Sequence, residues 1–309
     1  MTEPLSDLAT ASRWSWLFGR RLPILVGVGV LLALALYYPV GAWRASVVDD
    51  NPHFAPGPLA PGQSQAIALA ALLIRREIDQ HGWAPNKPFF MPAAILTDMP
   101  NFQKGVMVGI GRFAREVSDL DGDLARAAEL LQYPATTWMI DPSAPWAHTL
   151  SAEKQYRNAA RGFESFNQKL AAQQGNFPHR RDRLAALVEA FADELDQQAA
   201  LLDVVASGTS WFDRQPERVF YSGKGRAYAA LMLLTSLGED FAPDLAETGL
   251  TESWRKMLAS VSAAALPAPW LVLTGSPDAN FWPNHPAQQG FYLLRAKSRL
   301  VELAGRLRG

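Results

Sequence analysis

The hydrophobic positions of the chain begin with one long uncharged run, from Leu22 to Trp43. As a helix it would span roughly 33 Å at about 1.5 Å per residue, enough to cross a hydrocarbon core of about 30 Å. The run contains none of the charged side chains whose burial in a bilayer is costly. Aromatic residues that suit the headgroup level lie at both of its ends: Trp14 and Trp16 precede the run, and Tyr37, Tyr38 and Trp43 close it. The pattern predicts a transmembrane helix at residues 22–43.

Charges on the two sides of this run predict its orientation. Arg20 and Arg21 precede it, whereas Arg44 is soon followed by Asp49 and Asp50. The positive-inside rule then places residues 1–21 in the cytoplasm. A cleaved signal peptide is the alternative, but the apolar run is longer than a usual signal core and no small-residue cleavage site follows it. We therefore expect an uncleaved signal anchor in a bacterial inner membrane, with the bulk of the chain in the periplasm.

A stretch rich in proline and glycine follows, at residues 44–62. Its proline density disfavours both helix and central strand, so it predicts a linker that holds the body away from the bilayer. Residues 63–309 would then form a separate extracytoplasmic α-helical domain, able to fold as a fragment.

Apolar residues in this domain recur with the spacing of helices, and period-two strand patterns are unpersuasive. Two apolar stripes, at residues 156–170 and 184–205, are joined by a short connection and predict an antiparallel helical hairpin. Gly105, Gly109 and Gly111 lie inside a predicted helix and indicate a close helix–helix contact. The fold class predicted is mostly α, with further helices expected at residues 64–81, 98–117, 123–132, 225–237, 251–264 and 286–308.

Composition narrows the function classes. Hydrophobic residues make up 49% of the chain and charged residues 19%, which is typical of a folded body. A formal net charge of −1 argues against a nucleic-acid partner. The chain has no cysteine, which excludes disulfides and thiolate chemistry, and its five histidines are scattered singly. We expect no metal and no cofactor.

Two polar segments resemble ligand sites only superficially. Asp119, Asp121 and Asp123 alternate as in a calcium loop, but leucines occupy the positions of the required glycine and glutamate. We interpret the segment as a polar loop with Asp123 as a helix cap. Residues 221–226 (Tyr-Ser-Gly-Lys-Gly-Arg) could hold an anion at a helix start, although a glycine-rich helix entry is the simpler interpretation.

Loops rich in tryptophan and proline carry the candidate binding surface. Aromatic rings beside polar groups can form a platform for a sugar or a peptide, or they can seal the core. The candidate residues are Trp138, Trp146, Trp282, Asn284 and His285. An enzyme would instead need a cleft in which at least two acid–base residues meet, drawn from Glu116, Asp119, Asp213, His148 and His285.

Three short segments carry a family resemblance: residues 86–92 (Asn-Lys-Pro-Phe-Phe-Met-Pro), 101–106 (Asn-Phe-Gln-Lys-Gly-Val) and 283–292 (Pro-Asn-His-Pro-Ala-Gln-Gln-Gly-Phe-Tyr). They resemble an uncharacterised bacterial family of single-span envelope proteins, domain of unknown function 2333. The resemblance covers nearly the whole chain and implies a membrane-anchored envelope protein, but it transfers no active site.

The predicted function is therefore an interaction or scaffold module of the envelope, with an envelope protein or a glycan as its partner. The alternative is a cell-wall-related hydrolase or a glycan-binding protein.

Overall fold

The computed structural model describes residues 12–141, 144–148, 150–206, 214–267, 269, 272–273 and 284–309. The side chains of residues 12–21 and 140–148 are outside this description. Trp282 and Asp213 therefore lie outside the described residues, as do the side chains of Trp146 and His148.

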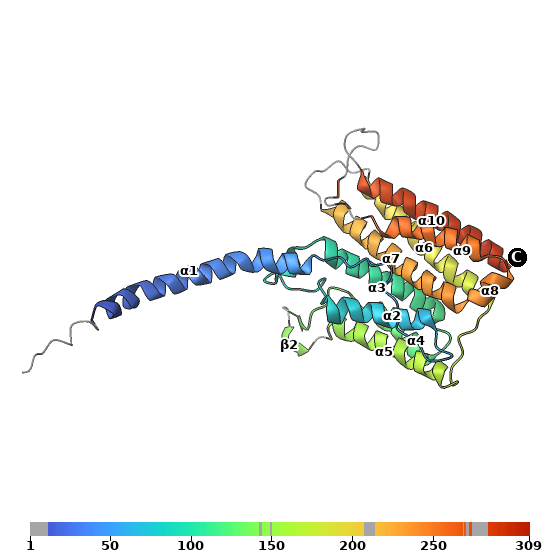
Figure 1. Cartoon of the computed structure of the whole chain (residues 1–309), viewed down its shortest axis with the longest axis horizontal. Helices are drawn as coiled ribbons and strands as arrows, with labels where there is room; N and C mark the ends of the chain where they lie inside the picture. Colours follow the sequence, from blue (N-terminus) through green and yellow to red (C-terminus); the bar gives the residue numbers. More distant parts are fainter. Residues whose placement is uncertain are drawn as a thin grey trace, which may run out of the picture.

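The first helix, α1 (Ser12–Ala45), projects from the rest of the molecule (Figure 1). From Leu22 to Ala45 it is long and apolar enough to cross a membrane, and none of this part is buried in the protein. Pro23 and Pro39 lie within it, as transmembrane helices tolerate. The helix begins ten residues before the predicted span and ends two residues after it.

The remaining chain is predominantly helical, as predicted. Its α-helices and its two short non-α helices are α2 (Gln65–Arg75), the π-helical η1 (Arg76–Gln80), the 3-10 helix η2 (Pro92–Ile95), α3 (Asp98–Val117), α4 (Gly122–Leu131), α5 (Ala152–Ala171), α6 (Arg181–Ala206), α7 (Gln215–Asp240), α8 (Ala242–Glu247), α9 (Thr251–Ala265) and α10 (His285–Arg308). A short antiparallel pair, β1 (Ile140–Asp141) and β2 (Ala144–His148), was not expected from the sequence.

The helices form layers around α3 and α7, which pack against each other at the centre (Figure 1). On one side, α6, α9 and α10 pack together and against α7. On the other side, α2 and α4 both pack on α5. The α2 helix also contacts α7, and α4 also contacts α3. One continuous hydrophobic core runs through all of these layers.

The close contact predicted by the helix glycines is confirmed for two of the three. A Cβ on Gly105 would lie 2.2 Å from the Ser222 carbonyl oxygen, and a Cβ on Gly109 would lie 2.6 Å from the Ala229 Cβ. Both face α7. A Cβ on Gly111 would meet only the Leu131 Cβ of α4, at an ordinary 3.6 Å.

The partner glycine on α7 corrects the interpretation of residues 221–226. The segment lies inside α7, which begins at Gln215, so it is not a helix entry and lacks the free backbone amides of a helix start that the anion interpretation required. A Cβ on Gly225 would lie 2.1 Å from the Phe102 carbonyl oxygen, so glycine here allows the two backbones to touch. The local pattern resembled a helix start because the contact that requires glycine is made with a distant part of the sequence.

The predicted helical hairpin is wrong, although both of its helices exist. The α5 helix packs against α4 and α2, whereas α6 packs mainly against α10 and α7. Residues 172–180 join them across the end of the bundle opposite α1 (Figure 1). The two apolar stripes pack against different helices. An apolar stripe predicts that one face of a helix is buried, but it does not predict which helix covers that face.

The loop of alternating aspartates also differs in detail. Asp121, not Asp123, caps α4, because its carboxylate accepts the Asp123 backbone N–H at 2.8 Å. The Lys169 ammonium lies 2.9 Å from Asp121 and 2.8 Å from Asp123. Within the described part of the chain, no group of three or more His, Asp or Glu side chains is placed to hold a metal ion.

Candidate functional site

Residues 46–54, here called the strap, leave α1 and lie against the helical domain. Val48 and Phe54 are half-buried and pack on the hydrophobic core. Asp49 faces Arg76 of η1 and His81, which follows η1, and Asp50 faces Lys224 of α7. This part of the predicted linker therefore belongs to the folded body, and the expectation of a spacer over residues 44–62 needs correction.

Lys224 is the first of the strap's two buried partners. Its side chain is 2% exposed, in the middle of α7. The Nζ atom donates to the Asp50 carboxylate at 2.6 Å and to the Pro267 carbonyl oxygen at 2.8 Å. An ammonium buried without a counter-ion costs several kcal/mol, so the strap supplies a charge that the domain needs.

Arg76 is the second partner, and its side chain is 1% exposed. It opens the π-helical turn η1, a distortion frequent at functional sites. Its guanidinium donates to Glu77 at 2.7 Å and to the Tyr228 hydroxyl at 2.8 Å. It also lies 3.5 Å from the Asp49 carboxylate and 4.7 Å from the centre of the Phe54 ring, a cation–π distance. Both strap side chains thus close over the same cation.

Burial and pairing fix the protonation of this cluster. Burial raises the pKa of Tyr228 to about 12, so its hydroxyl keeps the proton that it donates to the Asn51 carbonyl oxygen at 2.7 Å. Burial by itself would lower the pKa of Arg76, but Glu77 and Tyr228 outweigh it and the pKa is raised. Arg76 stays charged, and its donors are directed at protein acceptors. The arrangement is suited to holding the strap.

A second contact joins α1 itself to the domain. The Tyr38 hydroxyl donates to the Phe89 carbonyl oxygen at 3.3 Å. Three residues further on, a Cβ on Gly41 would lie 2.4 Å from the Pro92 Cγ, so only glycine fits against η2. The last turns of α1 are therefore held by the loop before α3, and the strap just beyond α1 is held by Lys224 and Arg76.

The structure separates the described members of the predicted aromatic surface. Trp138 is half-buried and packs edge-on against Phe90, with ring centres 6.3 Å apart. Asn284 caps α10 by accepting the Ala287 N–H at 3.0 Å. The His285 Nδ1 accepts the Leu273 N–H at 2.9 Å, and burial lowers the pKa of this imidazole. β2, which follows Trp138, and the start of α10 lie on opposite sides of the bundle, so these residues do not form one continuous surface (Figure 1).

Acid–base residues give the hydrolase alternative little support. Glu116 and Asp119 both lie near Arg183, which donates to the Glu116 carbonyl oxygen and pairs with the Asp119 carboxylate. The hydrogen bond from Arg183 lowers the pKa of Asp119, whose side chain is 62% exposed. An ionised, paired and solvated carboxylate is poorly suited to general acid catalysis. His285 lies at the start of α10 instead, bonded to Leu273.

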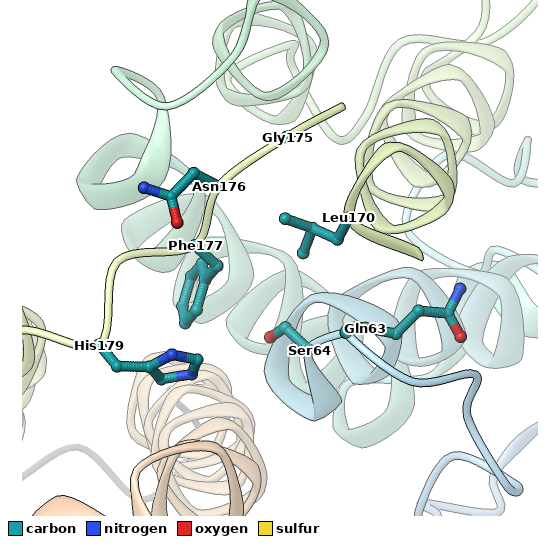
Figure 2. Close-up of a pocket in the computed structure, with 8 residues that line it drawn as sticks. Gln63, Ser64, Leu170, Gly175, Asn176, Phe177 and His179 are labelled. Atoms are coloured by element: carbon teal, nitrogen blue, oxygen red, sulfur yellow. The ribbon is translucent and has the colours of Figure 1, made fainter. Parts of the chain in front are cut away.

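A small cavity of about 160 Å³ brings Ser64 and His179 to one place (Figure 2). The Ser64 hydroxyl donates to the Asp240 carboxylate at 2.7 Å, and that carboxylate also accepts the backbone N–H of Gln65 at 2.7 Å. Ser64 and Asp240 therefore cap α2. Among the described contacts, the His179 ring packs on Phe177 and Phe241 and makes no hydrogen bond to Ser64, so a catalytic triad is not assembled.

Comparison of the chain with protein-family models, with curated proteins and with solved structures gives no match. The resemblance to the single-span envelope family therefore stays a prediction. Sequence reasoning does not predict the strap cluster: the two adjacent aspartates after the apolar run indicate orientation, but not which side chains they pair with.

Proposed function

We propose that this protein is a bitopic bacterial inner-membrane protein whose helical domain acts in the periplasm as an interaction or scaffold module. In this proposal α1 crosses the membrane once, with residues 1–21 in the cytoplasm. The resemblance to the single-span envelope family favours the same assignment. The partner is an envelope component, either a protein or a glycan.

The observation that carries the proposal is the attachment of the domain to the end of α1. A flexible linker leaves a tethered domain free to take many positions, whereas contacts between a domain and its anchor present its surface at a set place. Here Asp50 binds Lys224, Asp49 lies beside Arg76, and Tyr38 binds the loop at Phe89. These contacts support a domain held in a fixed position at the membrane.

Two reporters fused at Gly309 test the orientation. We expect a reporter that folds only outside the cytoplasm to be active there, because the cations precede the apolar run and the acids follow it. A reporter active only in the cytoplasm should be silent at Gly309 and active when fused before Met1 of the full chain. The reverse pattern would refute the orientation, and a mature product that begins near Ser46 would refute the uncleaved anchor.

A further inference from the structure

An uncharged loop beside the end of α1 exposes several large apolar side chains. Residues 88–96 (Pro-Phe-Phe-Met-Pro-Ala-Ala-Ile-Leu) contain no charged group, and we call them the apolar loop. Phe89 is 85% exposed, Ile95 51% and Phe90 46%. Single exposed apolar residues are ordinary on a protein surface, but a cluster in one short loop marks a site of contact.

The position of the apolar loop is fixed by α1. Tyr38 donates to the Phe89 carbonyl oxygen, and Gly41 packs against Pro92. The loop is thus level with the last apolar turns of the candidate span, just before Trp43, which is 76% exposed. If α1 crosses a bilayer, these residues lie at its headgroup level, where aromatic side chains are favoured.

We propose that the apolar loop inserts its Phe89, Phe90 and Ile95 side chains into the same bilayer that α1 crosses, at the boundary between headgroups and acyl chains. This inference rests on the proposed membrane span. We assign lipid as the molecule that covers these side chains, because the loop contacts the span directly. A protein partner would have to enter between the loop and the adjacent bilayer.

Neighbouring residues extend the same face. Trp138 packs edge-on against Phe90, and Met139, which follows it, is 57% exposed. The charge at the near edge of the loop is neutralised, since Lys87 lies 3.3 Å from Glu153. An apolar face with paired charges at its edge suits shallow insertion at a membrane interface. In this proposal Trp138 supports a membrane-facing loop, in place of its predicted role in a surface that binds a sugar or a peptide.

Fluorescence quenching in the full chain tests the insertion. Because the chain has no cysteine, single variants Phe89→Cys and Ile95→Cys can each carry an environment-sensitive fluorophore. Val301→Cys is the matched control: it is 50% exposed, like Ile95, and lies on α10, which runs toward the C-terminal end away from α1 (Figure 1). Leu36→Cys reports on the span itself. The proteins are reconstituted in phosphatidylcholine vesicles with and without lipids spin-labelled near the top of the acyl chain.

We expect quenching at Phe89 and Ile95 to exceed that at Val301 several-fold, with strong quenching at Leu36. Equal, weak quenching at Phe89, Ile95 and Val301, with Leu36 still quenched, would overturn the insertion and leave the span intact; the loop would then face water or a protein. Absence of quenching at Leu36 would overturn the span and the insertion together. Circular dichroism of each labelled variant verifies that the helical fold is retained.

Discussion

A fragment that begins at residue 63 is expected to be less stable than one that begins at residue 46 by about 3 kcal/mol or more, because removal of one partner strands a buried charge. The shorter fragment loses the strap, and with it the carboxylates that face Lys224 and Arg76. Loss of one partner of a buried ion pair costs about 3–5 kcal/mol, and we expect the lower value here because Asp50 is itself 30% exposed. Urea unfolding of the two fragments, followed by circular dichroism, measures the difference.

A rescue variant separates lost charge pairing from a general effect of truncation. Lys224→Met removes the buried ammonium, so in the shorter fragment it should recover part of the lost stability. The control is Lys256→Met, whose ammonium is 67% exposed and should change stability by no more than about 0.5 kcal/mol. Equal stability of the two fragments would restore the interpretation of residues 44–62 as a spacer.

Gly225→Ala is expected to destabilise the domain by about 3 kcal/mol, the upper end of overpacking costs. The added Cβ would lie 2.1 Å from the Phe102 carbonyl oxygen and 2.9 Å from the Val106 nitrogen, both in the backbone of α3. Backbone cannot move aside as a flexible side chain can, so α3 and α7 must separate. At about 2–4 °C per kcal/mol for a domain of this size, thermal unfolding should shift by roughly 6–12 °C.

Gly305→Ala is the matched control for this substitution. Gly305 is also within a helix, α10, but a Cβ there would meet nothing within 4 Å. Its replacement should therefore raise stability, by up to about 1 kcal/mol, through better helix propensity. A similar change in melting temperature for both variants would contradict a close crossing of α3 and α7.

Elements with strong local signals were predictable. Ser64 was the first residue of one predicted helix, and it caps α2 by accepting the Ile67 N–H at 3.2 Å. Pro100 lies in the first turn of α3, where its missing N–H is no loss. The limits of α9 and α10 were also correct to within about a residue. In each case the deciding interaction is made within one helix, so the local pattern contains it.

Features that depend on distant contacts were not predictable. The start of α7 lies ten residues before the predicted one, because Gly223 and Gly225 resemble a helix boundary unless their contacts with distant helices are known. Gly225 meets the backbone of α3, and Gly223 meets side chains of α6 and α10. The strap was missed for the same reason: nothing near Asp50 in sequence indicates that Lys224 is buried opposite it. A single sequence records burial and propensity, but it does not record which elements meet.

The fixed position of the domain relative to α1 is tested most directly by a disulfide between the two. A Cβ on residue 41 lies 2.7 Å from the Pro92 Cβ, so cysteines at both positions are within reach of a bond after slight separation. Two double variants are compared in native membranes. The first pair combines Gly41→Cys and Pro92→Cys, and the second pair combines Gly41→Cys and Val301→Cys. We predict nearly complete intramolecular cross-linking of the first pair on mild oxidation and none of the second. A first pair that stays reduced, with both thiols still reactive, would contradict the account and show a domain on a flexible tether.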